Sequence, residues 1–263
     1  MKMNLFQPFH LVTVSPWPLL SSMMIFSLLT FVVNWFYLNK VNYMLYLVIL
    51  ILVVVLFQWW RDVVREGLFQ GFHTVKVVRG LKYSFILFII CEVFFFISIF
   101  WCYLHMSLSP SVEIGGLWPP LNLNMFNPYL IPLMNTLILL SSGGFVTLSH
   151  YSLLNNKKYI SIFMMFMTIF LGWLFSLLQY MEYEECGFTF CDSVFGSIFF
   201  LSTGFHGVHV LAGSMFLLIS LLRMIMKDFS SIHHFGVEAS IWYWHFVDVV
   251  WLFLYLLVYF WFY

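Results

Sequence analysis

Charged residues are scarce in this sequence. Asp, Glu, Lys and Arg make up 8% of its 263 residues, whereas a soluble domain carries about 25%. Hydrophobic residues make up 63%, more than one soluble core can hide from water, so the composition predicts an integral membrane protein of the all-α class. The 11 basic and 11 acidic residues balance. Without a basic tail, the chain gives no reason to expect nucleic acid as a partner.

Motifs for three kinds of redox or photochemical centre are absent. The four cysteines form no Cys-x-x-Cys pair of the metal-binding type, and no Glu-x-x-His pair of the di-iron type occurs. No lysine lies near the middle of an apolar segment, which excludes a retinal Schiff base. We therefore expect no metal on this chain. We interpret Cys91 and Cys102, which lie on a buried span, as small apolar fillers, and a disulfide between Cys186 and Cys191 is left open.

Seven apolar segments are long enough to cross a bilayer as helices. They occupy residues 17–37, 43–60, 81–105, 129–151, 159–181, 193–226 and 235–263. The longer connections are a basic loop at 67–80, a proline-rich loop at 106–128 and an acidic loop at 182–192. We divide the chain into an N-terminal lead with two helices (1–66), the basic loop (67–80) and a five-helix bundle (81–263). The second helix is expected to continue through its terminal charges, with Asp62 paired to Arg65.

Basic residues divide unevenly between the two sides that seven crossings define. Of the 11 Lys and Arg residues, only Lys40 falls on the side opposite the N-terminus. The acidic residues on that side are Glu113, Glu182, Glu184, Glu185 and Asp192. Because basic loops stay on the negative side of a membrane, the N-terminus is expected on the matrix or cytoplasmic side and the C-terminus on the other.

One carboxylate, Glu92, lies in the middle of the apolar segment 81–105. An ionised carboxylate that faces lipid is costly, so Glu92 is expected to face protein, a polar crevice or water, or to stay protonated. Ionisable residues inside membrane spans are functional candidates, and Glu92 is the leading one here.

A second polar set lies on the last two segments. It comprises His206, His209, Glu238, His245 and Asp248, spaced so that the residues of each helix share a face. We interpret this set as an interhelical hydrogen-bond network. Two alternatives remain open. One is a stand-alone proton or ion carrier that uses Glu92, Asp248 and the histidines. The other is a metalloenzyme with ligands from His206, His209 and His245.

Aromatic and basic residues gather on the N-terminal side of the predicted membrane. Arginine suits phosphate groups and tryptophan suits the membrane interface, so this set is a candidate for binding anionic lipid headgroups. The alternative is an ordinary excess of positive charge on that side, without a specific lipid. The set comprises Trp59, Trp60, Arg61, Arg65, His73, Arg79, Arg223 and Lys227.

Several motifs, in order along nearly the whole chain, resemble subunit III of the mitochondrial-type cytochrome c oxidases. The most specific are Gln58–Val63, Gly115-Gly116 with Trp118-Pro119-Pro120, Thr203–Val210, and His233–Ala239 running into Trp242–Trp251. Departures from the family pattern occur at residues 121–126, Ser84, Leu148 and Tyr151. These bear on loop shape and packing.

The resemblance implies a two-helix bundle and a five-helix bundle with a lipid-filled V-shaped cleft between them. It implies a non-catalytic subunit of the inner mitochondrial membrane that binds structural phospholipids, with haem a and copper in the partner subunits. Its partners are catalytic subunit I and the other complex IV subunits, and assembly into respiratory supercomplexes is left open. Glu92 matches the family's buried carboxylate. The implied role is to stabilise the catalytic subunit and maintain its proton uptake.

Overall fold

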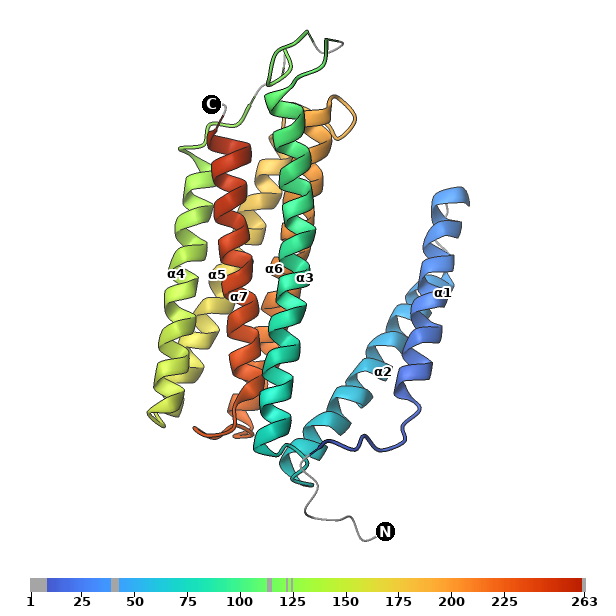
Figure 1. The fold of residues 1–263 in the computed structure, drawn as a ribbon, viewed down its shortest axis with the longest axis vertical. Coiled ribbons are helices and arrows are strands. Elements are labelled where there is room, and N and C mark those ends of the chain that lie inside the picture. The colour runs from blue at the N-terminus through green and yellow to red at the C-terminus, as the bar shows by residue number, and fades with distance from the viewer. Residues whose placement is uncertain (1–8, 39–42, 113–114, 122, 124, 262–263) are drawn as a thin grey trace. The chain divides into compact units, whose positions relative to one another are not determined.

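The computed structural model describes residues 9–38, 43–112, 115–121, 123 and 125–261. Within these residues the regular elements are helices and no strand occurs (Figure 1). Seven helices among the described residues are long and apolar enough to cross a membrane, which confirms the predicted all-α fold with seven spans. Three of the charged residues used to predict which side of the membrane each terminus faces lie outside the described residues: Lys2, Lys40 and Glu113.

Most helix ends fall within a few residues of those predicted, because proline, glycine and capping residues mark them. For example, α6 begins after Ser193, whose hydroxyl accepts a hydrogen bond from the Gly196 amide at 3.0 Å. The helices are α1 Trp17–Leu38, α2 Tyr43–Leu68, α3 Val75–Leu108, α4 Ile131–Leu154, α5 Lys158–Glu184, α6 Val194–Ile225 and α7 Phe235–Leu254, which continues as the π-helical turn η2 Tyr255–Phe260.

Two predicted loops are shorter in the structure. Helix α2 continues through its charged residues, as expected, but α3 already begins at Val75, so the segment 67–80 is a loop only at 69–74. Likewise α5 extends to Glu184, and Glu182 is fully buried inside it rather than lying in an acidic loop. The reason is the same in both places: charged residues end a hydrophobic run, but Lys, Arg and Glu are good helix formers.

The chain divides into two compact units, Met1–Leu81 and Lys82–Tyr263. The first contains α1 and α2, which pack against each other (Figure 1). Few side chains of these two helices are buried within the unit, and most apolar ones face outward. An outward apolar face of this kind suits lipid or a neighbouring subunit.

Polar side chains join α1 to α2 at one end. Trp17 Nε1 donates a hydrogen bond to Asp62 Oδ2 at 2.7 Å. Arg61 forms an ion pair with Asp62, with Nη2 and Oδ1 3.0 Å apart. Asp62 therefore uses these two partners rather than the predicted ion pair with Arg65, because Trp17 reaches it from the neighbouring helix.

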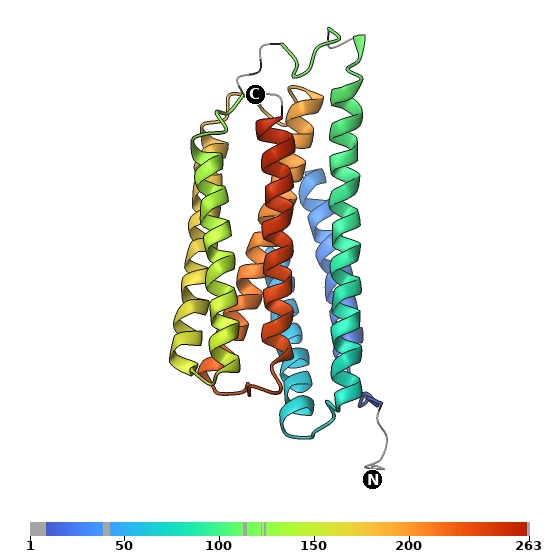
Figure 2. The same ribbon diagram turned by 60° about the vertical axis from the view of Figure 1, so that its left-hand side comes forward.

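Helix α7 is the most buried helix of the second unit and lies between α4 and α3 in both views (Figures 1 and 2). Its Trp244 is fully buried and donates from Nε1 to Ser142 Oγ on α4 at 2.8 Å. The close packing requires a glycine on α5, because a Cβ at Gly172 would lie 2.5 Å from Trp244 Cη2. The indole of Trp244 thus reaches the backbone of α5 at Gly172.

We expect Gly172→Ala to lower the free energy of unfolding by about 1–3 kcal/mol, because the added methyl group must displace a fully buried indole. Gly144→Ala is the matched control. Gly144 is also helical, but a Cβ there would meet nothing within 4 Å. Thermal unfolding in detergent measures both variants. Unchanged stability of Gly172→Ala would contradict the close packing of Trp244 against Gly172.

The four cysteines are free. Cys91 and Cys102 are exposed on α3, so the prediction that they fill space on a buried span is wrong. Cys186 and Cys191 do not form the disulfide that the sequence left open. The Cys186 thiol donates to the Phe188 carbonyl at 3.1 Å, and burial raises the pKa of this thiol.

Candidate functional site

Glu92 on α3 faces His209 on α6. Glu92 Oε2 and His209 Nε2 are 3.1 Å apart. The exposed fraction is 27% for the Glu92 side chain and 13% for that of His209. The rings of Phe96, Tyr243 and Phe246 surround the imidazole, with Phe96 edge-on at a centroid distance of 5.1 Å. Glu92 thus has a protein partner on a facing helix, inside an aromatic shell.

The hydrogen bonds of His209 fix how many protons the pair holds. His209 Nδ1 lies 2.7 Å from the Phe205 carbonyl oxygen, and only a protonated ring nitrogen can face a carbonyl oxygen at that distance. His209 Nε2 and Glu92 Oε2 then need one further proton between them. The pair is therefore either an ion pair or a neutral hydrogen bond, and it holds a single exchangeable proton in both forms.

His206 points into the core of the bundle rather than toward α3. Its ring is fully buried against Trp251 and Phe175, with centroid distances of 5.1 and 5.6 Å. Its Nε2 lies 3.2 Å from the Val247 carbonyl oxygen, so Nε2–H donates from α6 to α7. His206 is thus a structural hydrogen-bond donor between two helices.

His245 and Asp248 form a pair of their own on α7, with Nδ1 and Oδ2 3.7 Å apart. Asp248 is buried against α4, where a Cβ at Gly143 would lie 2.8 Å from Asp248 Oδ2. Among the described residues, no hydrogen bond or ion pair joins this pair to either histidine of α6. The single network predicted from the sequence divides into separate contacts, because each side chain points toward a different neighbouring helix.

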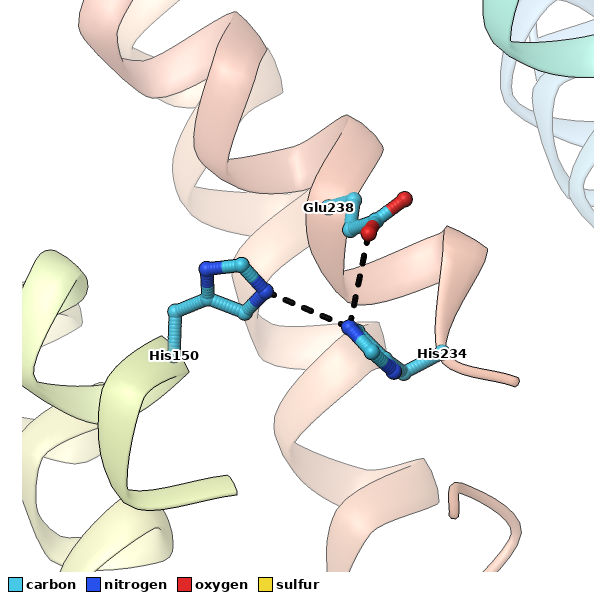
Figure 3. A group of neighbouring side chains, drawn as sticks. All are labelled: His150, His234 and Glu238. Atoms are coloured by element: carbon cyan, nitrogen blue, oxygen red, sulfur yellow. Dashed lines mark hydrogen bonds and ion pairs between the residues drawn. The ribbon is translucent and has the colours of Figure 1, made fainter. Parts of the chain in front are cut away.

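Glu238 lies at the N-terminal end of α7, in a separate cluster. Its Oε2 forms an ion pair with Lys82 Nζ of α3 at 2.5 Å. Its Oε1 lies 3.4 Å from Nε2 of His234, the N-cap residue of α7, and that Nε2 is 3.2 Å from Nε2 of His150 on α4 (Figure 3). Sequence reasoning missed His150 and His234 as site residues. The i,i+4 spacing of His234 and Glu238 was the available signal.

The predicted lipid-binding residues have varied surroundings. Arg61 pairs with Asp62, and Arg223 pairs with Asp228 at 3.4 Å while its guanidinium lies 4.2 Å from the centre of the Phe229 ring. These two arginines therefore already have protein partners. The half-buried members are Trp59, Arg61, His73 and Arg223. The exposed members are Trp60, Arg65, Arg79 and Lys227.

Comparison with known proteins decides the family. A family model described as cytochrome c oxidase subunit III matches residues 7–263. The cytochrome c oxidase subunit 3 of Aedes aegypti is 54% identical over 254 residues, with 97% of both chains covered. That of Rhipicephalus sanguineus is 53% identical over 258 residues, which cover 98% of this chain and 100% of the relative. That of Drosophila melanogaster is 50% identical over 254 residues, with 97% of both covered.

The chain belongs to the cytochrome c oxidase subunit III family. The resemblance read from the motifs is therefore confirmed. Two of those motifs carry the polar contacts described above. Thr203–Val210 contains His206 and His209, and His233–Ala239 contains His234 and Glu238. In this member of the subunit III family, the most specific sequence blocks are thus also places where facing helices make polar contacts.

The alternative of a metalloenzyme built on His206, His209 and His245 is wrong. Each of these histidines points to a different partner: a backbone carbonyl, a glutamate and an aspartate, respectively. Within the described residues, the ligand-type side chains that converge are His150, His234 and Glu238 instead, each with one potential donor atom within 4.8 Å of the other two.

Proposed function

We propose that this chain is a non-catalytic core subunit of mitochondrial cytochrome c oxidase, complex IV. It supports the catalytic subunit in electron transfer from cytochrome c to oxygen, coupled to proton pumping. The haem a and copper centres belong to partner subunits, with catalytic subunit I as the neighbour, and respiratory supercomplexes are a further level of assembly. The family match over residues 7–263 is the observation that carries the proposal.

The proposed location is the inner mitochondrial membrane, with the N-terminus in the matrix and the C-terminus in the intermembrane space. Seven membrane-length helices support a multi-pass protein. The distribution of Lys and Arg supports the orientation, since basic connections stay on the negative side. Exposed Trp60, Arg65, Arg79 and Lys227 support the binding of structural phospholipids on the matrix side.

Two roles follow for this subunit. The outward apolar faces of its helices stabilise the catalytic subunit together with bound lipid. The basic matrix side and nearby carboxylates keep proton uptake fast at the neighbouring subunit, and the negatively charged carboxylates do so by raising the local concentration of protons. The single proton held between Glu92 and His209 supports a proton-linked role for that pair.

Depletion of this subunit from the purified oxidase tests the proposal. We expect the haem a and copper content per catalytic subunit to stay unchanged, because the redox centres lie elsewhere, while proton uptake slows or the working life of the enzyme shortens. Metal analysis and time-resolved proton uptake measure the two effects. Oxidase taken through the same detergent treatment with the subunit retained is the control. Loss of haem or copper together with this chain would contradict the proposal.

A stand-alone proton or ion carrier through Glu92 and Asp248 is the alternative function. Such a carrier needs a relay between the two carboxylates. Within the described residues, each carboxylate pairs with its own histidine and no hydrogen bond links the pairs. Vesicles that contain only this chain should therefore show no gradient-driven proton flux, and a clear flux would favour the carrier.

A further inference from the structure

We propose that His150, His234 and Glu238 form a binding site for a divalent metal ion of the zinc type. The three side chains bring together the C-terminal part of α4 and the N-terminal end of α7 (Figure 3), and an ion bound by them would link the two helices. His150 lies one turn before the end of α4, His234 is the N-cap of α7, and Glu238 lies in the first turn of α7. The site is separate from the Glu92–His209 pair.

The spacing of the donor atoms fits tetrahedral zinc. Zinc binds imidazole nitrogen at about 2.0–2.1 Å, so two ligands of a tetrahedral ion lie about 3.3 Å apart. The Nε2 atoms of His150 and His234 are 3.2 Å apart, and His234 Nε2 and Glu238 Oε1 are 3.4 Å apart. One potential donor atom of each residue lies within 4.8 Å of the other two. Two of the ligand-to-ligand distances therefore already match those of a tetrahedral zinc site.

The protonation of His234 also favours a bound cation. Its Nδ1 lies 3.1 Å from the Ser230 carbonyl oxygen and therefore carries the proton of the neutral ring. The lone pair of its Nε2 then points into the cluster and faces the Glu238 carboxylate, which can only accept hydrogen bonds when ionised. Two acceptors at 3.4 Å repel each other, and a cation bound between them would remove this repulsion. Metal-binding histidines commonly donate their other N–H to a backbone carbonyl in this way.

Lys82 orients the carboxylate. Its ammonium group holds Glu238 Oε2, which leaves Oε1 directed toward His234. Carboxylates that bind metals are commonly hydrogen-bonded through their second oxygen. Two imidazoles and one carboxylate suit zinc better than magnesium or calcium, which prefer oxygen ligands. Three protein ligands leave a fourth position for water, and the half-buried His150 and Glu238 lie close enough to the surface to admit it.

Protons are the competing occupants: His150 Nε2–H can donate to His234 Nε2 across their 3.2 Å contact, and a second proton on His234 can face Glu238. An imidazolium would donate from Nε2 to Glu238 Oε1 and would remove the need for a metal. Metal and protons respond oppositely to pH, because metal binding releases the proton and weakens as the pH falls. Metal titrations at two pH values therefore distinguish them.

The test uses the full-length chain in detergent, dialysed against zinc chloride alone and then against metal-free buffer. We expect one zinc per chain by elemental analysis, bound more tightly at the higher pH, and at least tenfold weaker binding in His150→Ala and in His234→Ala. His233→Ala is the matched control, since this neighbouring histidine lies outside the cluster, and its zinc binding should match that of the wild type. Retention of zinc by His234→Ala at the wild-type level would overturn the proposal.

Cobalt(II) chloride provides a readout that does not depend on the alanine variants folding. Cobalt at this site should show the visible absorption of tetrahedral coordination. His150→Cys keeps a ligand at the same place and should add a thiolate-to-cobalt charge-transfer band. Absence of that band in the folded Cys variant, or only the weak spectrum of octahedral cobalt in the wild type, would overturn the site.

Discussion

Trp244→Ala should lower the free energy of unfolding by about 3 kcal/mol, the largest loss we expect from truncating one side chain. Trp244 is fully buried, donates to Ser142 at 2.8 Å and packs against Gly172 and Gly213. The loss lies at the lower end of the usual range for a buried tryptophan. Inside a membrane, this loss of stability comes from lost packing and one lost hydrogen bond, because the side chain is not transferred from water to the core when the protein folds. Trp244→Phe should lose only about 1 kcal/mol, since most of the packing remains.

Trp173→Ala is the matched control for this prediction. Trp173 is on α5 and is 53% exposed, so its truncation leaves no cavity and should change stability by no more than about 0.5 kcal/mol. Denaturant titration of each variant in detergent micelles, followed by circular dichroism, measures the differences. A loss at Trp173 equal to that at Trp244 would show that α7 is not the packed centre of its unit.

Glu92→Gln should abolish labelling of this chain by a hydrophobic carbodiimide without unfolding the protein. Carbodiimides that partition into apolar phases react with a carboxyl group that carries or shares a proton. Glu92 is partly exposed within its span and shares one proton with His209. The amide keeps the size of the side chain and a hydrogen-bonding group toward His209, so the fold should persist. Mass spectrometry of labelled peptides measures the loss.

Glu182→Gln is the control for the labelling experiment. Glu182 is also a carboxyl group inside a helix, but it is fully buried, so the reagent should not reach it and labelling should match that of the wild type. Label found on Glu182 or Glu185 of the unsubstituted chain, with Glu92 unlabelled, would mean that Glu92 is inaccessible and that the proposed proton sharing is wrong.

The number and order of the helices could be predicted from the sequence because each span is a long apolar run bounded by proline, glycine or charge. Their ends were less predictable where charge follows a span. Lys76 and Arg79 lie within α3, and Glu182 lies within α5, because a charged side chain near the membrane surface can continue a helix. Hydropathy marks where the apolar run ends, but the helical backbone can continue beyond that residue.

The partners of the polar residues could not be predicted, since they depend on how each helix is rotated against its neighbours. His206 and His209 share a face by spacing, yet one donates to a backbone carbonyl of α7 and the other faces Glu92 on α3. His150 and His234 are 84 residues apart in sequence and meet only because α4 packs against α7. Such contacts are long-range consequences of packing.

Purification through an affinity tag on this chain tests the central claim, that it is a subunit of a haem–copper oxidase and holds no electron carrier itself. We predict that haem a and copper co-purify with the tagged chain and that, after the complex is dissociated, iron and copper remain with the partner subunits. A tagged preparation without haem a, or iron or copper bound to the isolated polypeptide, would contradict the account.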